Sequence, residues 1–228
     1  IPDTGVDHKP LKRNPRYLIH DFNHSMRLLW RDKLGQISLA VTTLFWGAGA
    51  TLQFIVIKWA EASLHLDLSR ASLLQGVVAV GIAAGAVLAA RLVSLRKSVQ
   101  VIPLGIAMGI IVITMNFVDT IWMSVPLLIF IGALAGYFVV PMNALLQHRG
   151  HILMGAGHSI AVQNFNENLS ILVMTGLYSM LIAHISIYAL ITLFGVFVAL
   201  SMFLIMRRHQ ANEREYSQVK LLDDALNH

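Results

Sequence analysis

Residues Gly155–Tyr178, GAGHSIAVQNFNENLSILVMTGLY, combine the length of a membrane-spanning helix with a run of amides and one carboxylate. Glu167 follows Gly155 by 12 residues, which is about 18 Å along a helix. That depth is near the middle of a hydrocarbon core of about 30 Å. Polar groups there are costly and are kept where they face a cavity or another helix. We therefore interpret the rest of the chain as a scaffold that holds this helix in a bilayer.

The polar residues of this stretch form two stripes along the predicted helix, since successive residues turn by 100°. The first stripe is Ser159, Gln163, Asn166, Glu167 and Ser170, and the second is Gly157, Asn164, Asn168 and Thr175. We expect the first stripe to bind a ligand, because ionisable groups inside membranes are by default functional. The alternative is a structural carboxylate, protonated or hydrogen-bonded to its amide neighbours. We expect Asn164 and Asn168 to bond across to a neighbouring helix.

Composition places the chain among membrane proteins. It has 228 residues, of which 56% are hydrophobic and only 13% charged, whereas a soluble domain has about 25% charged residues. The absence of cysteine excludes disulfides and thiolate metal sites. The net charge of +5 comes from Lys and Arg in the tails and short loops beside apolar runs. This distribution argues against nucleic acid as a partner and favours a membrane.

Six apolar runs have about the 20 residues that a spanning helix needs. They are Ile37–Ile57, Leu73–Leu92, Val99–Val118, Ile121–Leu146, Gly155–Ala183 and Ile185–Met206. The predicted fold is therefore an all-α membrane protein with a six-transmembrane-helix bundle over residues 36–206. Residues 1–35 are predicted to be a cytoplasmic linker containing an amphipathic helix between Asn14 and Lys33. This helix either lies at the membrane surface or is a solvated connector. Residues 207–228 form a charged cytoplasmic tail.

Basic residues in alternate connections predict the orientation, because cytoplasmic loops are enriched in Lys and Arg. The N-terminal segment, the loop between the second and third runs, the loop between the fourth and fifth runs, and the tail all carry them. Examples are Arg27, Arg96, Arg149 and Arg207, whereas the opposite side has mainly Arg70. Both termini are therefore predicted to be cytoplasmic.

Small residues indicate close helix packing, since GxxxG spacing lets helices approach one another. The spacing occurs at Gly81/Gly85, Gly105/Gly109 and Gly132/Gly136. Pro126 and Pro141 are expected to kink the fourth span, because proline has no N–H to donate within a helix.

Polar residues outside the fifth run add fewer candidates. Gln53 lies well inside the first run and is a candidate ligand contact. Asn143, near the cytoplasmic end of the fourth run, is expected at a gate or helix interface, together with Asn164, Asn168 and Pro141. His20 and His24 have i, i+4 spacing, but no third metal ligand accompanies them. Phosphate-loop and zinc-protease motifs are absent from the sequence, so we expect no enzyme activity, cofactor or metal.

Several motifs resemble a known family. LFWGAGATL (Leu44–Leu52), FVVPMNALLQ (Phe138–Gln147), and GAG at Gly155 followed by IAVQN and Glu167-Asn168 are similar to those of bacterial lysophospholipid transporters of the major facilitator superfamily. The resemblance extends from about Trp30 to Arg208. It departs from the family pattern at Gln53, where relatives have Arg. The superfamily loop signature G-x-x-x-D-R/K also loses its acidic residue, because Ala89 stands there.

The resemblance implies a fold of twelve spans in two halves, of which this chain is expected to be the C-terminal half, with a missing N-terminal six-helix half. It implies transport of lysophospholipids such as lysophosphatidylethanolamine across the bacterial inner membrane. It also implies a partner, the acyltransferase–acyl-carrier-protein synthetase that reacylates them. Glu167 would then face the ammonium of the head group, with Gln163 and Asn166 donating to its phosphate or glycerol hydroxyl.

Two other readings stay open. One is a proton-coupled exporter of amphipathic compounds, with Glu167 as the proton carrier, since carboxylates in apolar sites can bind protons. The other is a non-transporting membrane module, either an inert fragment or a scaffold for the acyltransferase, because six spans make only half of a cavity. Six further spans encoded upstream would remove most of the support for this second reading.

Overall fold

The computed structural model describes residues 15–226, and all of its regular structure is helical, with no strand among these residues. The first 14 residues of the predicted linker therefore lie outside the described residues, as do the last two residues of the tail. The helices are α1 (Pro15–Arg31), α2 (Lys33–Ser63), α3 (Leu68–Leu92), η1 (Leu95–Val101), α4 (Ile102–Ile113), η2 (Thr114–Phe117), α5 (Ile121–Met154), α6 (Ala156–Leu181) and α7 (Ile187–Leu226).

Five segments are long and apolar enough to cross a membrane: α2, α3, the η1–α4–η2 segment, α5 and the part of α7 up to Tyr216. They correspond to five of the six predicted spans. The remaining predicted span, the fifth along the chain, is α6, a helix of 26 residues that does not reach the same mean apolarity. Its amides and carboxylate lower that average, so its status as a span stays a prediction.

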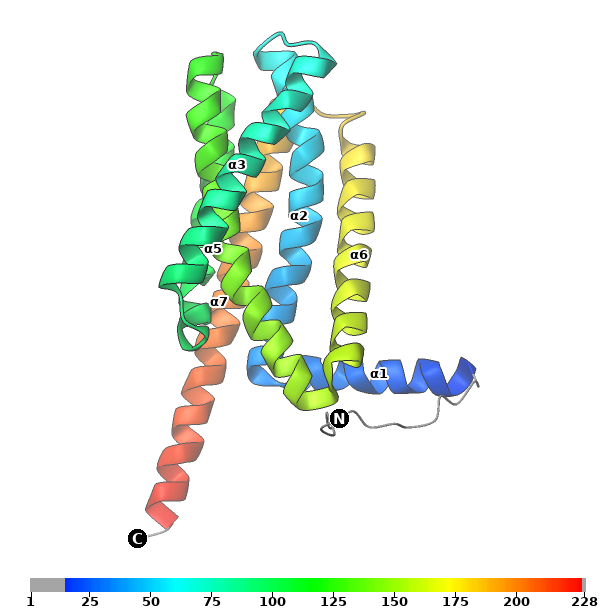
Figure 1. Ribbon diagram of the computed structural model, residues 1–228, viewed down its shortest axis with the longest axis vertical. Coiled ribbons are helices and arrows are strands. Elements are labelled where there is room, and N and C mark those ends of the chain that lie inside the picture. The colour runs from blue at the N-terminus through cyan, green and yellow to red at the C-terminus, as the bar shows by residue number, and fades with distance from the viewer. Residues whose placement is uncertain (1–14, 227–228) are drawn as a thin grey trace, which may run out of the picture.

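Figure 1 shows the long helices standing side by side, with α1 lying across one end of the bundle. The described start of α1 and the far end of α7 lie toward this same end. The described part of the predicted tail is not an irregular segment, because α7 continues as one helix to Leu226. A short connection containing His184 joins α6 to α7, and the His184 N–H donates to the Leu181 carbonyl.

The glycine pairs make the close helix contacts that their spacing predicts. A side-chain carbon added at Gly81 or Gly85 of α3 would overlap the backbone of α5, and one at Gly132 or Gly136 of α5 would overlap the backbone of α3. Gly109 of α4 meets the backbone of α7 in the same way. The two helix pairs α3–α5 and α4–α7 are therefore packed backbone against backbone.

The main apolar core lies between α2, α4, α5 and α7. Trp59 of α2 is fully buried there, and its indole N–H donates to the carbonyl of Met115 at 2.9 Å. This bond satisfies the one polar group of the side chain, which a buried tryptophan requires. α5 is continuous through Pro126 and Pro141, and Pro141 is buried.

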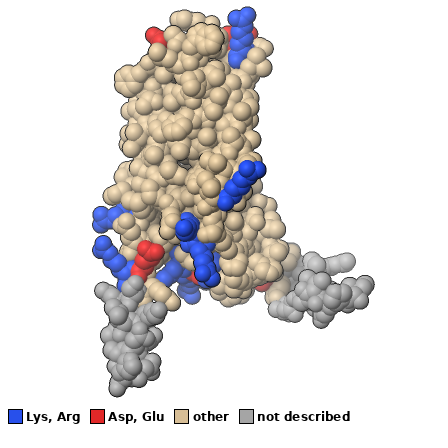
Figure 2. Space-filling view, turned by 60° about the vertical axis from the view of Figure 1, so that its left-hand side comes forward, with Lys and Arg blue, Asp and Glu red and all other residues tan. Residues whose placement is uncertain are grey.

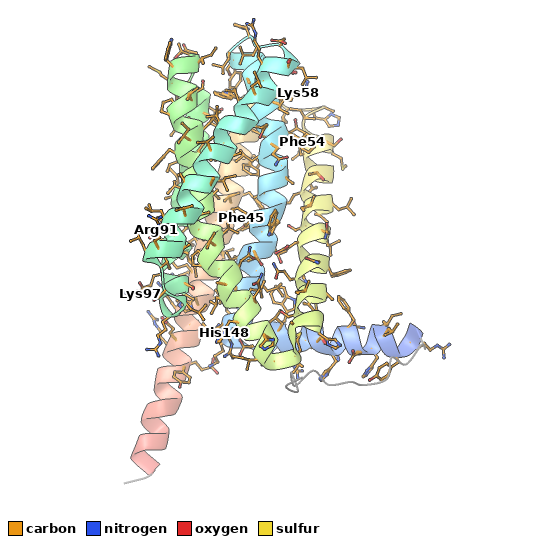
Figure 3. The ribbon with its side chains drawn as sticks, viewed as in Figure 1. Phe45, Phe54, Lys58, Arg91, Lys97 and His148 are labelled. Atoms are coloured by element: carbon orange, nitrogen blue, oxygen red, sulfur yellow. The ribbon has the colours of Figure 1, made fainter. Side chains whose placement is uncertain are left out.

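Charged side chains are distributed unevenly along the length of the bundle. On the face drawn in Figure 2, most Lys and Arg side chains lie in the half toward α1, and the surface above them is uncharged except for a few charged side chains at its very top. Figure 3 places Lys58 near the opposite end and places Arg91, Lys97 and His148 in the half nearer α1. This segregation agrees with the charge pattern from which the orientation was predicted.

Candidate functional site

Gln163 and Glu167 form the polar centre of α6. They lie one helical turn apart, and each is only 8% exposed. Gln163 Nε2 donates to Glu167 Oε1 at 2.8 Å and to Asn143 Oδ1 of α5 at 3.2 Å. Both N–H groups of this amide are thereby engaged, and its carbonyl oxygen is the group left to accept a further hydrogen bond.

Trp46 of α2 completes the surroundings of Glu167. Trp46 lies beside the Glu167 carboxylate, which accepts its hydrogen bond from the Gln163 amide. Residues of two helices thus surround the carboxylate. Trp46 is itself 42% exposed, whereas Glu167 is buried. A carboxylate in such a setting can bind an ammonium or another cationic group through a charge-assisted hydrogen bond.

Ser159 and Ser170, predicted to bind a ligand, lie at helix contacts. Ser159 is 2% exposed and fills the space that a side chain at Gly150 of α5 would need. Ser170 likewise fills the space that a side chain at Gly47 of α2 would need. These two contacts, one toward each neighbouring helix, hold α6 in place on either side of Glu167.

Asn166 points away from the Gln163–Glu167 pair. Its Nδ2 donates to the Val162 carbonyl at 2.8 Å and approaches the Met26 sulfur of α1 at 3.3 Å. The expected cross-helix bonds of Asn164 and Asn168 are not formed within the described residues. Asn168 Nδ2 instead donates to the Asn164 carbonyl of its own helix at 2.8 Å, and both side chains are exposed.

Gln53 lies apart from this cluster, at an apolar pocket of about 630 Å³ lined by residues of α2 to α7, among them Ile171 of α6. Its side chain is exposed, and its backbone carbonyl accepts a hydrogen bond from Gln75 Nε2 of α3 at 2.9 Å. Trp46 also lines the pocket. Figure 3 labels Phe45, which lines the pocket, at a position on α2 below Phe54.

Two members of the cluster were not assigned to a ligand site from the sequence. Asn143 was expected at a gate or helix interface, and its hydrogen bond to Gln163 across the α5–α6 contact also makes it part of the cluster. Trp46 was noted only as part of a family motif. A signal existed for both, because Trp46 is followed by Gly47-Ala-Gly49 and Asn143 is an amide within an apolar run, two residues after Pro141.

An ion pair joins the start of α2 to the last turns of α5, which are the ends predicted to be cytoplasmic. Arg149 Nε donates to Asp32 Oδ1 at 2.9 Å, and a second bond joins Nη2 to Oδ2. Asp32 also caps α2 by accepting from Gly35 N–H at 2.7 Å. Burial acts to raise the pKa of Asp32, but the hydrogen bonds from Arg149 and Gly35 outweigh it and hold this pKa below its usual value.

The histidines lie outside the cluster. His158, in the first turn of α6, contacts Asp21 of α1 with 2.7 Å between Nε2 and Oδ2. His20 and His24 are both exposed on α1. Within residues 15–226, no group of three or more His, Cys, Asp or Glu side chains is placed to hold a metal ion.

Comparison with known proteins identifies similar transporters. The chain is 43% identical over 183 residues to the lysophospholipid transporter LplT of Yersinia pestis strain Pestoides F, and equally to that of Yersinia pseudotuberculosis serotype I strain IP32953. The alignment covers 80% of this chain and 45% of each relative. No protein-family model matches the chain, and no solved structure matches it. The chain thus spans about half the length of these relatives, and its resemblance to the lysophospholipid transporters, which its motifs indicated, is confirmed.

Proposed function

We propose that this chain is the C-terminal half of a lysophospholipid transporter of the bacterial inner membrane. The observation that carries the proposal is 43% identity, over 80% of the chain, to proteins named as lysophospholipid transporters. The chain spans 45% of their length, which supports a second half of similar size. We take this half to be an N-terminal group of six spans, as in the major facilitator superfamily.

In this proposal α6 is the fifth of the six spans. Its 26 residues reach about 39 Å as a helix, more than the hydrocarbon core requires. Its low apolarity is what a helix at a central cavity needs, because polar residues in membranes face cavities or protein. The exposed amides Asn164 and Asn168 would then face the other half of the transporter.

The head group of the lysophospholipid binds at Glu167. A zwitterionic lysolipid carries an ammonium, which complements the buried carboxylate. Because both N–H groups of Gln163 are engaged, its free carbonyl oxygen accepts from the ammonium or a glycerol hydroxyl, in place of the phosphate contact expected from the sequence. An acyltransferase–acyl-carrier-protein synthetase would reacylate the product on the cytoplasmic side and so sustain net inward transport.

Lysolipid uptake tests the function directly. Inner-membrane vesicles containing the complete transporter should take up labelled lysophosphatidylethanolamine, and vesicles without it should not. Uptake should also persist when the proton gradient is collapsed, since removal of the product by reacylation is sufficient to drive it. Absence of uptake, or export of amphipathic dyes that stops when the gradient collapses, would contradict the proposal and favour a proton-coupled exporter.

The orientation has a test of its own. Both termini are cytoplasmic in the proposal, because Lys and Arg gather at the end that carries α1 and cytoplasmic segments are enriched in them. A reporter that is active only outside the cytoplasm should be silent when fused after Arg208 and active when inserted beside Asp67. The reverse pattern would invert the topology.

A further inference from the structure

Two glycines on neighbouring helices border open space. A side-chain carbon at Gly49 of α2 or Gly76 of α3 would meet no atom within 4 Å. The glycines of the α3–α5 contact differ, since there the added carbon would overlap backbone. Gly49 and Gly76 therefore do not serve helix packing, and both line the apolar pocket of about 630 Å³.

The pocket has the size and lining of a small-molecule site. Its volume lies within the range of about 300–1,000 Å³ typical of ligand pockets. None of the described residues that line it is charged, and the two amides among them are Gln53 and Gln75. Gln75 is occupied in bonding to the Gln53 carbonyl, which ties α2 to α3 near one end of the pocket. The remaining wall suits a hydrocarbon ligand.

The length of the pocket matches one acyl chain. Along α2 its lining runs from Phe45 to Val56, which is about 17 Å of helix. Half of a bilayer's hydrocarbon core is about 15 Å thick, and this is the depth that a single acyl chain fills. Trp46 lies near one end of this run, and Ile171 of α6, one helical turn after Glu167, also lines the pocket. The apolar pocket therefore adjoins the part of α6 that carries the polar cluster.

We propose that this pocket binds the acyl chain of a lysophospholipid, which enters beside Trp46, passes Gly49 and extends to Gly76 beside Gln75. The inference rests on the proposed function, because it places the head group at Glu167. The absence of side chains at Gly49 and Gly76 keeps the channel open. Gly49 lies one helical turn from Gln53 on the side of Trp46, so it borders the part of the acyl chain nearest the head group. Gly76 borders the far end of the acyl chain.

Chain-length selectivity tests the assignment. Uptake of palmitoyl and octanoyl lysophosphatidylethanolamine is measured for the complete transporter and for its Gly49→Leu and Gly76→Leu variants at equal membrane abundance. Gly76→Leu should reduce palmitoyl uptake by about tenfold to a hundredfold and spare octanoyl uptake, since a few methylene groups in an apolar pocket have effects of that size. Gly49→Leu should reduce uptake of both substrates.

Val80→Leu is the matched control. Val80 on α3 is 63% exposed and does not line the pocket, so its substitution should leave the chain-length profile unchanged. If Gly49→Leu and Gly76→Leu both keep the wild-type profile, the acyl-chain assignment is wrong although lysolipid transport stands. If their effects are interchanged, the proposed direction of the chain is wrong. If the wild-type protein takes up no lysolipid, the proposed function itself fails.

Photo-crosslinking gives a readout that needs no variant and no transport. A lysophosphatidylethanolamine with a diazirine at the end of its acyl chain is irradiated with the wild-type transporter in vesicles, and labelled peptides are identified by mass spectrometry. Labelling should concentrate on the peptides of α2 and α3 that contain Gln53 and Gly76, and excess unlabelled palmitoyl lysolipid should suppress it. Labelling confined to lipid-facing positions of α7, such as Leu200, would overturn the proposal.

Discussion

The α3–α5 contact and the helix α6 represent opposite ways of placing a helix in this bundle. α3 and α5 meet backbone to backbone through glycines on both sides, so their contact is complete within the chain. α6 is held mainly along one side, where Ser159 and Ser170 sit against glycines of α5 and α2. Its other side exposes both apolar and amide side chains, among them Leu172 at 69%. We infer that α3–α5 is a finished structural unit, whereas α6 has a surface made for another part of the protein.

Breaking the finished contact should have the largest effect. Gly85→Leu introduces a side chain where even one carbon would overlap the Ala133 backbone. Overpacking of this kind costs about 3 kcal/mol or more when backbone has to move, so we expect loss of folded protein. Fluorescence size-exclusion chromatography and thermal unfolding measure the change. Gly176→Leu on α6 is the control with open space, and equal destabilisation by both substitutions would contradict the comparison.

The next largest effect is expected at the polar centre of α6. In the complete transporter, Glu167→Gln preserves shape and can still accept from Gln163 but removes the charge. A lost charged hydrogen bond costs about 1.5–3 kcal/mol, which is roughly one to two decades in affinity. Uptake of zwitterionic lysolipid should fall selectively relative to anionic lysolipid, with Leu200→Ala at an exposed position of α7 as the control. Equal loss of both substrates would indicate a structural carboxylate, and unchanged uptake would remove Glu167 from the mechanism.

A smaller effect is expected at the base of the bundle, where Asp32 joins α2 to the end of α5. Asp32→Asn should retain the helix cap, because asparagine also caps well, and lose the ion pair with Arg149. The side chains are 15% and 28% exposed, so we expect about 1–2 kcal/mol, less than the roughly 3–5 kcal/mol of fully buried pairs. A double-mutant cycle with Arg149→Gln isolates the pair, and additive effects would show that no coupling exists.

The same ion pair gives a pH dependence. The pKa of Asp32 is lower in the folded chain than its unfolded value, which is about 3.9 for aspartate. Its stabilising contribution is therefore fully present above about pH 4 and is lost as the pH falls through the folded pKa. Melting temperatures of wild type and Asp32→Asn should converge in that acidic range. A constant difference across it would contradict the assignment.

The smallest effect is expected on the exposed side of α6, and it should depend on context. Asn168→Ala changes an exposed side chain that bonds only to its own helix among the described residues. In the chain alone, the free energy of unfolding should change by less than about 0.5 kcal/mol, as is usual at surfaces. In the complete transporter the loss should be larger, because Asn168 would then face the second half. Identical effects in both contexts would mean that this side of α6 has no protein partner.

The fold was predictable where one run of residues suffices to specify it. Five spans were recognised from apolar length, and the glycine pairs of α3 and α5 meet as their spacing indicated. The helix boundaries extend beyond the apolar runs, since α2 begins at Lys33, a residue outside the apolar pattern. Its start depends on the Asp32 cap, which hydrophobic periodicity does not register.

The site was predictable only in part. The position of Gln163 and Glu167 on one face of α6 follows from helical geometry, and these two residues are indeed paired. The same geometry assigned Ser159, Ser170 and Asn166 to that face, but it could not say which neighbour each would meet. Asn143 joins the cluster from α5 because antiparallel helices bring distant residues together.

Composition and periodicity were therefore enough to establish a helical membrane chain, because transfer of an apolar run into a bilayer depends on the run alone. They also identified Glu167 as a carboxylate inside an apolar run, where a charged group is costly to bury. The tertiary structure alone decided which polar side chains contact neighbouring helices and which can still bind a ligand. A hydrogen bond needs two partners brought within about 3 Å. The tertiary structure likewise separated the glycines that seal helix contacts from Gly49 and Gly76, which leave a pocket open, because the space around a residue depends on all of its neighbours.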